Sequence, residues 1–525
     1  TLKGSDLIAG DNGINIESSG DVNIIDGQDT VTTKSSSNNY NVIGFTSSTE
    51  ETKSSTSKGS SLTSIGDINI ESGGNVKVVG SDLTSLGDTN ISAENDVKFE
   101  AGKNTYESKK SSVSVGVTST GAKAGLGGNS AEASWDPHTG GSTEIVDGDP
   151  QKVSKNSQNK TSGGKFGKNY MDSLTSVQTT VGVSVNNSSE KSTTWTEGNV
   201  TTGGNLNIKS KGTTDIGGAD FTTGGDFTIE AKDIETTKYT DVIETESTGV
   251  TVGIKGSNTT TSNIADAVNK GMQIADSALD SESGMNEALT GAQVGGTITN
   301  MIFGDILANT SSLTGEIGYN SSKTKSEKEN TTSIKSGGNV NFKTTDGDIN
   351  LKGVNVDAEG VNLDSAGNVN ITDAKETYTE SSKGVNVSGG ITVSGGVSAL
   401  DGGNTQIGAI GNVHYSQTEK NNELSHGSSI NAKNVTIKSE KDTNVIGSNV
   451  TGDNVNLDVK GNLNVETVKD KINESQVEGW GGGDLSIGAS TNTIATGDFG
   501  ASAGGGEIYK KGDSIDTQAG ITAKN

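Results

Sequence analysis

Apolar and polar residues alternate in short stretches along most of the chain. The recurring unit is a glycine, then Asn or Asp, an apolar residue, a polar residue and a second apolar residue. It occurs at Gly66–Ile70, Gly74–Val78, Gly204–Ile208, Gly338–Phe342, Gly367–Ile371 and Gly461–Val465. Because side chains of a strand alternate between its two faces, each unit predicts a short strand with one buried face. The Gly-Asn or Gly-Asp pair predicts a turn, since these residues tolerate positive φ.

The spacing of the units predicts a solenoid. Equivalent residues recur after 21 positions, as between Asp67 and Asp88, or after 20, as between Asn434 and Asn454. A single coil of that length cannot bury its own apolar face, but stacked coils can. We therefore predict an all-β fold, a right-handed parallel β-helix with coils of about 20–21 residues. An array of separate β-sandwiches would need longer strands and hairpin turns.

The alternation also predicts which residues point inward. The expected core positions are Ile68, Ile70, Val76, Val78, Leu206, Ile208, Val369 and Ile371. The residue between two apolar ones is often asparagine, as at Asn15, Asn23, Asn69, Asn90, Asn207, Asn341, Asn350, Asn370, Asn456 and Asn464. Stacked coils would align these into exposed amide ladders. We favour this structural role over a flat sugar-binding face, for which clustered aromatic residues are expected; Trp195 and Trp480 are scattered.

A longer repeat runs through the short one. Each copy passes from solenoid units into an alternating, glycine-flanked stretch, as at Val113–Val117 and Val250–Ile254. A second alternating stretch then returns, as at Val181–Val185, and a polar tract follows it. We interpret each pair of stretches as an antiparallel arm, or an extended coil wall, that stands out from the solenoid.

Two excursions interrupt the repeats. One is rich in Gly, Ser and Asn and contains both prolines, which predicts a surface excursion. The other has apolar residues at helical spacing from Ile264 to Leu279, which predicts a helical insertion. The expected segments are 1–118 (β-helix repeats with the first arms), 119–174 (surface excursion), 175–256 (β-helix repeats), 257–313 (helical insertion) and 314–525 (β-helix repeats).

The helical insertion could cap the β-helix or contact a membrane or partner. We favour the cap, because an amphipathic stripe usually faces its own core. Membrane contact by residues 257–313 is not favoured, since the stretch lacks the lysine-rich polar face of a membrane-surface helix.

Composition excludes several classes of protein. Of 525 residues, 75 are glycine, 28% are hydrophobic and none is cysteine, which is too little apolar material for a compact globule of this length. The net charge is −26 and the sequence contains no arginine, so nucleic acid is not an expected partner. No signal-peptide pattern is present in the first ten residues.

Candidate chemistry is sparse. Gly500–Gly504 matches the Gly-x-Ser-x-Gly nucleophile pattern, but that pattern needs a strand–turn–helix context, and further glycines follow it here. His138, His414 and His426 have no metal-ligand spacing. We therefore assign no catalytic, cofactor or metal residue, and no binding residue. A polysaccharide-degrading β-helix enzyme is a distant alternative, because the negative charge would repel acidic sugars.

The long repeat combines the start Gly80–Thr84 (G-S-x-L-T), the strand Gly66–Ile70 (G-D-x-N-I) and the exit Tyr378–Lys383 (Y-x-E-S-x-K). In these motifs it resembles the haemagglutinin repeats of two-partner secretion exoproteins, the family of filamentous haemagglutinins, large haemolysins and contact-dependent growth inhibition exoproteins. The resemblance covers nearly the whole chain, from about Leu7 to Asp516. It implies a right-handed parallel β-helix and export through an outer-membrane transport pore.

The resemblance also sets the expected function. We expect a non-enzymatic structural repeat segment of a large secreted exoprotein at the surface of a Gram-negative-type bacterium, internal to a larger chain. It would act as a stalk or carrier in cell–cell contact, adhesion or toxin delivery, with the transport pore and a target-cell receptor or glycan as partners. A glycan- or receptor-binding adhesin module is the alternative.

Overall fold

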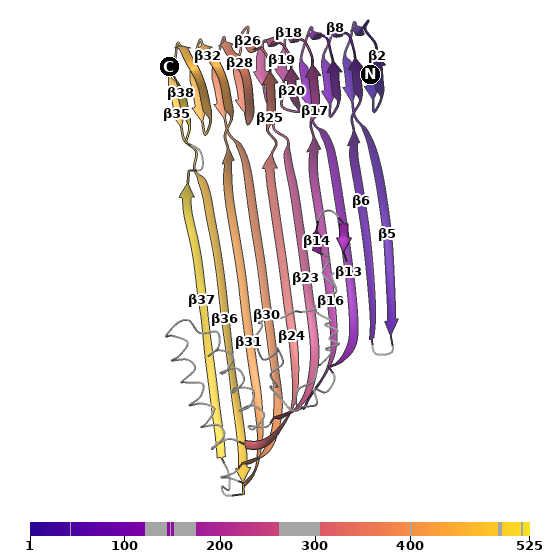
Figure 1. The fold of residues 1–525 in the computed structure, drawn as a ribbon, viewed down its shortest axis with the longest axis vertical. Coiled ribbons are helices and arrows are strands. Elements are labelled where there is room, and N and C mark those ends of the chain that lie inside the picture. Colours follow the sequence, from indigo (N-terminus) through magenta and orange to yellow (C-terminus); the bar gives the residue numbers. More distant parts are fainter. Residues whose placement is uncertain are drawn as a thin grey trace, which may run out of the picture.

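The computed structural model describes residues 1–41, 44–120, 144–146, 149–151, 175–261, 305–398, 402–491, 496–515 and 518–524. These residues form short parallel strands stacked into a solenoid and long antiparallel strands that extend from one side of it (Figure 1). The predicted β-helix with protruding arms is thereby confirmed. The right-handed sense of the coil stays a prediction from the crossover rule.

Two parallel sheets build the solenoid. In the described residues, the first contains β1 (Leu2–Lys3), β4 (Val22–Ile25), β9 (Val76–Val79), β12 (Val97–Glu100), β19 (Thr213–Asp215), β22 (Asp233–Glu235), β27 (Ile349–Lys352), β29 (Val369–Thr372), β33 (Thr443–Ile446) and β35 (Leu463–Glu466). These strands pair in that order, so each coil adds one strand to this sheet.

The second parallel sheet covers the other two faces of each coil. One face contains β2 (Asp6–Ala9), β7 (Ser61–Ser64), β10 (Asp82–Ser85), β17 (Gly198–Thr202), β20 (Ala219–Thr223) and β25 (Thr332–Ser336). The other contains β3 (Ile14–Ser18), β8 (Ile68–Ser72), β11 (Thr89–Ala93), β18 (Leu206–Ser210), β21 (Phe227–Ala231) and β26 (Asn339–Thr344). The strands β28 (Val354–Ser365), β32 (Ser429–Ser439), β34 (Asn449–Val459) and β38 (Gly520–Ala523) complete the sheet. The two faces join through β28, which pairs with both β25 and β26.

The arms form one antiparallel sheet, which we call the arm sheet. Its strands in the described residues are β5 (Gly27–Asn41), β6 (Gly44–Lys58), β13 (Gly102–Thr120), β16 (Thr175–Thr196), β23 (Thr240–Thr261), β24 (Asp305–Glu329), β30 (Ala374–Ser398), β31 (Gly402–His426), β36 (Asp470–Ser490) and β37 (Thr496–Ser514). They pair side by side in chain order. A separate small hairpin joins β14 (Glu144–Val146) to β15 (Asp149–Gln151).

The arm strands run further than the sequence indicated. Ser257, placed at the start of the helical insertion, pairs with Ser312 in the arm sheet, and Ser119 continues β13. The helix expected over 264–279 lies outside the described residues.

The arms and the solenoid grow in step. In the described part of the chain, two strands of the first parallel sheet precede each arm: β1 and β4 precede β5, and β9 and β12 precede β13, and so on to β33 and β35 before β36. Neighbouring strands in any sheet lie about 4.8 Å apart. Two coils therefore advance about 9.6 Å, which is the width of the two strands that one hairpin adds. This equality allows every arm to pair with the next.

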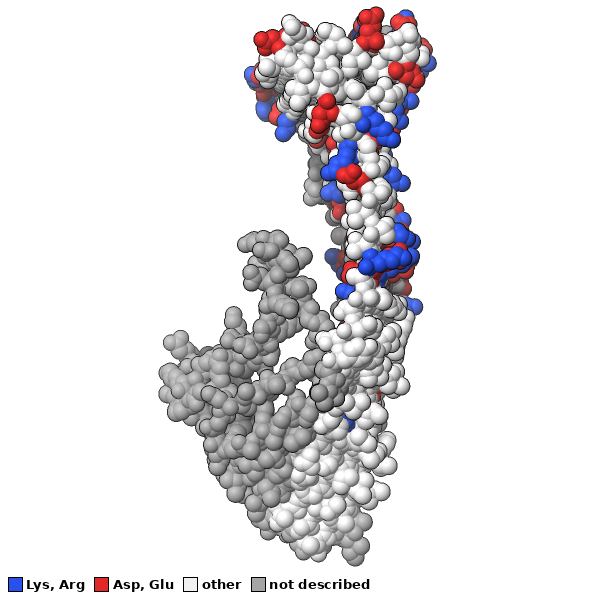
Figure 2. All heavy atoms as spheres, turned by 90° about the vertical axis from the view of Figure 1, so that its right-hand side faces the viewer, with Lys and Arg blue, Asp and Glu red and all other residues white. Residues whose placement is uncertain are grey.

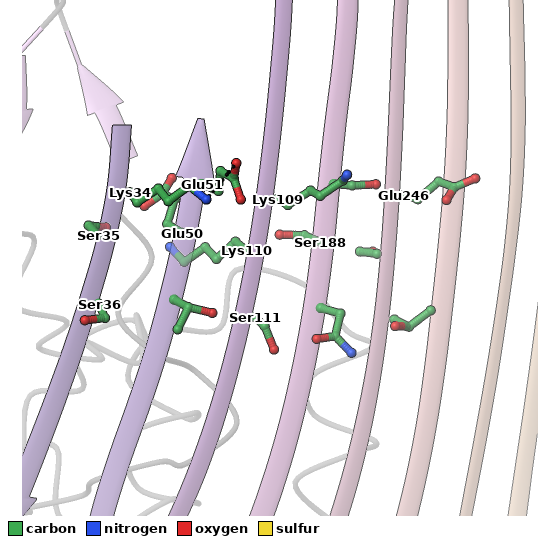
Figure 3. A pocket seen from close by; sticks show the side chains of 15 residues that line it. Lys34, Ser35, Ser36, Glu50, Glu51, Lys109, Lys110, Ser111, Ser188 and Glu246 are labelled. Carbon is green, nitrogen blue, oxygen red and sulfur yellow. Dashed lines mark ion pairs between the residues drawn. The ribbon is translucent and has the colours of Figure 1, made fainter. Parts of the chain in front are cut away.

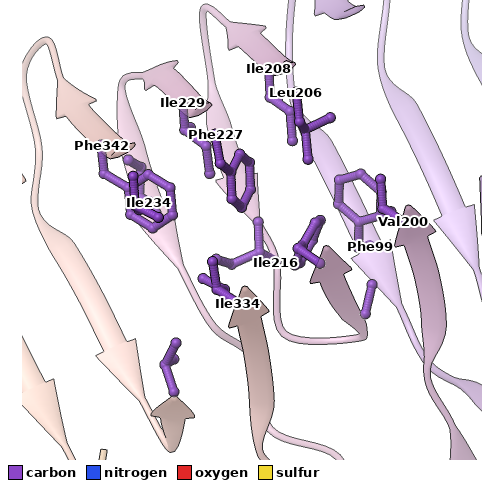
Figure 4. Packing of buried hydrophobic residues seen from close by; sticks show 14 of the residues in the cluster. Phe99, Val200, Leu206, Ile208, Ile216, Phe227, Ile229, Ile234, Ile334 and Phe342 are labelled. Atoms are coloured by element: carbon purple, nitrogen blue, oxygen red, sulfur yellow. The ribbon is translucent and has the colours of Figure 1, made fainter. Parts of the chain in front are cut away.

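The coil length matches the prediction. Leu62 lies beside Leu83 in the neighbouring coil, and Ile349 lies beside Val369, which are separations of 21 and 20 residues. The eight predicted core residues are all 2% exposed or less. At the centre of the solenoid, Phe99, Phe221, Phe227 and Phe342 pack in sequence with ring centroids 5.0–5.3 Å apart, the middle pair stacked and the outer two edge-to-face (Figure 4).

The glycine of the Gly-Asn or Gly-Asp unit has a different role from the predicted one. None of the six quoted units has its glycine at positive φ, which in the described residues is confined to Gly4, Gly13, Gly80, Gly353 and Gly447. Instead, a Cβ on Gly204 would lie 2.2 Å from Asp88 Oδ1 in the preceding coil. That oxygen accepts a hydrogen bond from the backbone N–H of Asn205 at 2.7 Å. Glycine is thus required for close approach, and the positive-φ explanation was wrong.

The same bond recurs from coil to coil. Asp67 accepts from the N–H of Asp88, Asn205 accepts from the N–H of Asp226, and Asp226 accepts from the N–H of Asn339. In each case the side chain belongs to the earlier coil and the N–H to the later one. The Asn or Asp of the unit therefore links successive coils.

Replacing Gly204 by alanine should destabilise the solenoid by about 2 kcal/mol, because the new Cβ would collide with Asp88 Oδ1. The double variant Gly204→Ala, Asp88→Ala should be at least about 1 kcal/mol more stable than the two single changes predict by addition. Gly20→Ala is the control, since a Cβ there meets nothing within 4 Å. Thermal melting would measure the two single variants, the double variant and the control, and strict additivity would contradict the steric explanation.

The predicted amide ladders are present for most of the asparagines named, whereas Asn23 lies beside Lys77 and Asn456 beside Thr436. Asn15, Asn69, Asn90 and Asn207 form one ladder, in which each Nδ2 donates to the Oδ1 of the preceding asparagine at 2.9 Å. A second ladder joins Asn350, Asn370, Asn444 and Asn464 at 2.7 Å. These amides bond to one another along the stack, which favours the structural role over sugar binding.

Candidate functional site on the arm sheet

An aromatic pair lies where the second and third arms join the solenoid. Trp195, at the solenoid end of β16, donates from Nε1 to the carbonyl oxygen of Thr240 at 3.0 Å. Its ring centroid is 5.0 Å from that of Tyr239, and Lys103 Nζ lies 5.8 Å from the centroid of the same ring. Burial raises the pKa of the Tyr239 hydroxyl. Trp195 is therefore held within the fold, beside a cavity of about 550 Å³ that Lys191 and Lys238 also line.

Two oppositely charged groups are partly buried at the same junction. Burial raises the pKa of Glu197 to about 7, and the nearby carboxylate of Asp220 adds to the effect. Oε1 of Glu197 is buried and accepts no hydrogen bond. Burial lowers the pKa of Lys238 to about 8, although the charge of Glu197 opposes this. Lys238 Nζ donates to Thr332 Oγ1 at 3.3 Å.

The junction should make stability depend on pH. A carboxyl with a raised pKa holds its proton more tightly in the folded state, so its contribution to stability falls as pH rises from about 4.5 to 7. Glu197→Gln removes this titration. Relative to the parent, the variant should gain roughly 1 kcal/mol between pH 4.5 and pH 7.5, after allowance for solvent screening. Thermal melting across that range would measure the difference, and parallel pH profiles would contradict the assignment.

Further along the arms, a band of lysine and glutamate crosses the sheet. Lys53, Glu107, Lys191, Glu244 and Lys325 are direct neighbours on five adjacent strands, and their charges alternate. Figure 2 shows these charges on the part of the arms nearest the solenoid. Each exposed pair contributes little energy, but opposite charges directly across a strand pair favour one register.

A shallow groove of about 630 Å³ adjoins this band (Figure 3). Its charged lining residues include Lys34, Glu51, Lys109 and Glu246, and serines lie among them. Lys34 and Lys53 both contact Glu51, at 3.4 and 3.3 Å. Because both signs are present and paired, the groove offers no net charge to a ligand.

Beyond the charged band, one face of the arm sheet is apolar and exposed. A single row contains Phe45, Val115, Val183, Val252, Ile317, Val387 and Val413 on seven adjacent strands. The side chains that we call the apolar arm face are each between 41% and 62% exposed: Val181, Val183, Val250, Val252, Ile254, Leu313, Ile317, Val387, Ile391, Val393, Ile407, Val413, Leu485 and Ile487. Figure 2, which shows the arm sheet edge-on, has few Lys, Asp or Glu atoms on the visible described surface of this end of the arms.

Sequence reasoning missed the apolar arm face, because polar residues lie evenly along the chain. One signal was available: in the arms, the residues between the valines are often Gly, Ser or Thr, as in Val181–Val185, whereas asparagine is frequent in the solenoid units. The alternation was correctly taken as a strand, but not as a strand that exposes its apolar side.

The candidate catalytic residues do not form a catalytic arrangement. Gly500–Gly504 lies within β37 and pairs with residues 480–484 of β36, so it has no strand–turn–helix geometry. His414 is exposed on β31, and His426 Nε2 lies 2.8 Å from Glu376 Oε2. His138 lies outside the described residues. Within the described ranges, no three His, Cys, Asp or Glu side chains are grouped to hold a metal ion.

The two scattered tryptophans do not come together. Alternation places Trp195 on the same side of the arm sheet as Val183, whereas Trp480 lies on the other side, next to His414 on β31. Trp480 is half exposed and covers Gly504 of the neighbouring strand. No helix among the described residues has the length and hydropathy needed to cross a membrane.

Comparison with known proteins gives one family. A model described as hemagglutinin repeat matches residues 43–162, 149–241 and 313–482. Filamentous hemagglutinin of Bordetella pertussis is 29% identical over 255 residues, which are 48% of this chain and 7% of that protein. The protein adenylyltransferase and cysteine protease IbpA of Histophilus somni is 27% identical over 305 residues, 56% of this chain and 7% of that protein.

A third relative is the 16S rRNA endonuclease CdiA of Enterobacter cloacae, 31% identical over 150 residues, 27% of this chain and 4% of that protein. The chain thus spans less than a tenth of the length of each of these relatives. No solved structure matches.

Proposed function

The chain belongs to the hemagglutinin repeat family, and from this premise we propose that it is a structural segment of a large secreted exoprotein. It serves as a stalk or carrier at the surface of a Gram-negative bacterium, in cell–cell contact, adhesion or toxin delivery. An outer-membrane transport pore of the two-partner type is its partner in export. The similarity to filamentous hemagglutinin and CdiA supports this assignment.

The observation that carries the proposal is the match between two coils and one hairpin. Each such unit extends the solenoid and the arm sheet by the same length, about 9.6 Å. The segment can therefore be lengthened or shortened by whole units without changing its cross-section. That property suits a part whose contribution is length and rigidity.

We do not propose for this segment the enzymatic activities that the names of two relatives state. Adenylyltransferase, cysteine protease and endonuclease describe whole proteins of which the matched part is 7% or 4%. An adhesin role has less support, because Trp195 is engaged by Thr240, Tyr239 and Lys103 and Trp480 lies on the opposite side of the sheet.

The proposal is tested in the full-length exoprotein by deleting residues 334–429. Ile334 and Ile430 occupy equivalent positions, each beside Val356, so the deletion removes two coils and one hairpin and preserves register. We expect a rod shorter by about 10 Å by electron microscopy, reduced contact or delivery, and unchanged target choice.

A binding experiment separates stalk from adhesin. The isolated chain should show no saturable binding on a glycan array. A single strong, competable glycan ligand would overturn the stalk proposal in favour of the adhesin, and loss of that binding in Trp195→Ala or Trp480→Ala would locate its site.

A further inference from the structure

The two sides of the arm sheet differ in chemistry. Beyond the row that contains Lys383 and Glu507, the side with the apolar arm face carries Val, Ile, Leu, Phe and Tyr, with Gly, Ala, Ser, Thr and Asn between them and no charged residue in the described strands. The other side carries the charged residues of the same stretch, such as Lys255, Glu316, Asp484 and Asp498. The sheet is therefore amphipathic beyond the band, and no described residue covers its apolar side.

The exposed apolar area is larger than a monomer normally leaves in water. With each side chain about half exposed, the apolar arm face presents on the order of 1,000 Å². The largest apolar patch on a typical monomer is about 300–600 Å². A stable interface buries about 800 Å² on each partner, so the apolar arm face alone is large enough for one.

We infer that the apolar arm face is an interface with a second copy of this chain, in which two arm sheets pack face to face. The face is regular, since its rows of β-branched residues cross adjacent strands in register. A regular row of this kind is complementary to an identical row, because two sheets pack about 10 Å apart with their inward side chains interdigitated. The proposal is independent of the stalk role, which a monomeric segment could also fulfil.

Charge determines the orientation of the pair. The chain carries a net charge of −26, so two copies repel each other if their solenoids lie side by side. We therefore place the twofold axis in the plane between the two sheets, at right angles to the arm strands. This axis brings the two apolar arm faces together and places the two solenoids at opposite ends of the dimer. In this orientation the charged bands stay in solvent. The same patch is used on both copies, as in most soluble dimers.

Two variants of β31 test the interface with a matched control. Ile407 and Val413 are 59% and 48% exposed on the apolar arm face. Gln406 and His414 are their chain neighbours, are also exposed, and lie on the other side. Ile407→Lys with Val413→Lys therefore adds the same charges to the same strand as Gln406→Lys with His414→Lys, and only the side of the sheet differs.

Sedimentation at increasing protein concentration gives the readout. The parent chain should form dimers whose dissociation constant does not rise with added salt, because apolar contacts are not screened. The Ile407→Lys, Val413→Lys variant should weaken the dimer at least tenfold, while the control pair leaves it unchanged. Circular dichroism should show both variants folded.

Three outcomes would overturn the inference. The parent could remain monomeric at about 100 μM, far above the dissociation constant of a standard-sized interface. The two variant pairs could weaken association equally. The parent could also stay monomeric and bind phosphatidylcholine vesicles through the apolar arm face, which would identify lipid, rather than a second copy, as the occupant.

Discussion

Deleting residues 350–369 should break the pairing between the third and fourth arms while the solenoid stays folded. The deletion joins Ile349 to Asn370. Asn370 lies directly beside Asn350 in the stack and takes its place, so the deletion removes one coil and preserves the strand register. The third and fourth arms then start about 4.8 Å apart on the solenoid. Each arm is a hairpin of two strands and needs about 9.6 Å. β24 and β30 cannot remain side by side along their length.

The expected loss is large because these strands pair over most of their 25 residues. If each lost hydrogen bond contributes about 0.5–1 kcal/mol, the arm sheet loses on the order of 10 kcal/mol. Hydrogen exchange would show it as lost protection in β24 and β30. The control is deletion of 334–429, which removes two coils and the β30–β31 hairpin and places β24 beside β36, so that β24 should keep its protection. Equal protection in both deletions would contradict the matched-pitch explanation.

Ile70→Asp should destabilise the solenoid by about 3 kcal/mol or more, because it places an unpaired carboxylate in the core. Ile70 is 2% exposed and packs between Ile16 and Ile91 of neighbouring coils. Ile65→Asp is the matched control, since Ile65 is 56% exposed at the preceding turn. A melting curve for Ile70→Asp that coincides with the parent's would overturn the core assignment.

Local periodicity was sufficient to predict the solenoid. A period of two defined which side of each strand is apolar, and the 20–21-residue spacing showed that the apolar sides stack. Ile68 and Leu206, chosen on this basis, are fully buried. The antiparallel arms followed from paired alternating stretches. Each of these inferences depends only on residues within one or two coils of each other.

The arm sheet could not be predicted to the same depth, because its pairing depends on a distance along the solenoid. Val183 and Val252 are 69 residues apart, and they become neighbours only because two coils lie between their arms. Alternation alone does not say whether an apolar side is buried, so Val78 and Val183 look alike in sequence although one is 1% and the other 41% exposed. The steric role of Gly204 was likewise hidden, since the atom it avoids belongs to another coil.

The bonds between coils have a direction, and this has a consequence for how the chain folds. Asp67 Oδ1 accepts from Asp88, Asp88 Oδ1 from Asn205, and Asn205 Oδ1 from Asp226, always from a residue later in the chain. A coil that is already folded thus presents a fixed acceptor to the one that follows, whereas the later coil supplies the donors: a backbone N–H and, at Asn205, also the side-chain Nδ2. Folding can then propagate from the first coil towards the last, with each finished coil acting as the template for the next.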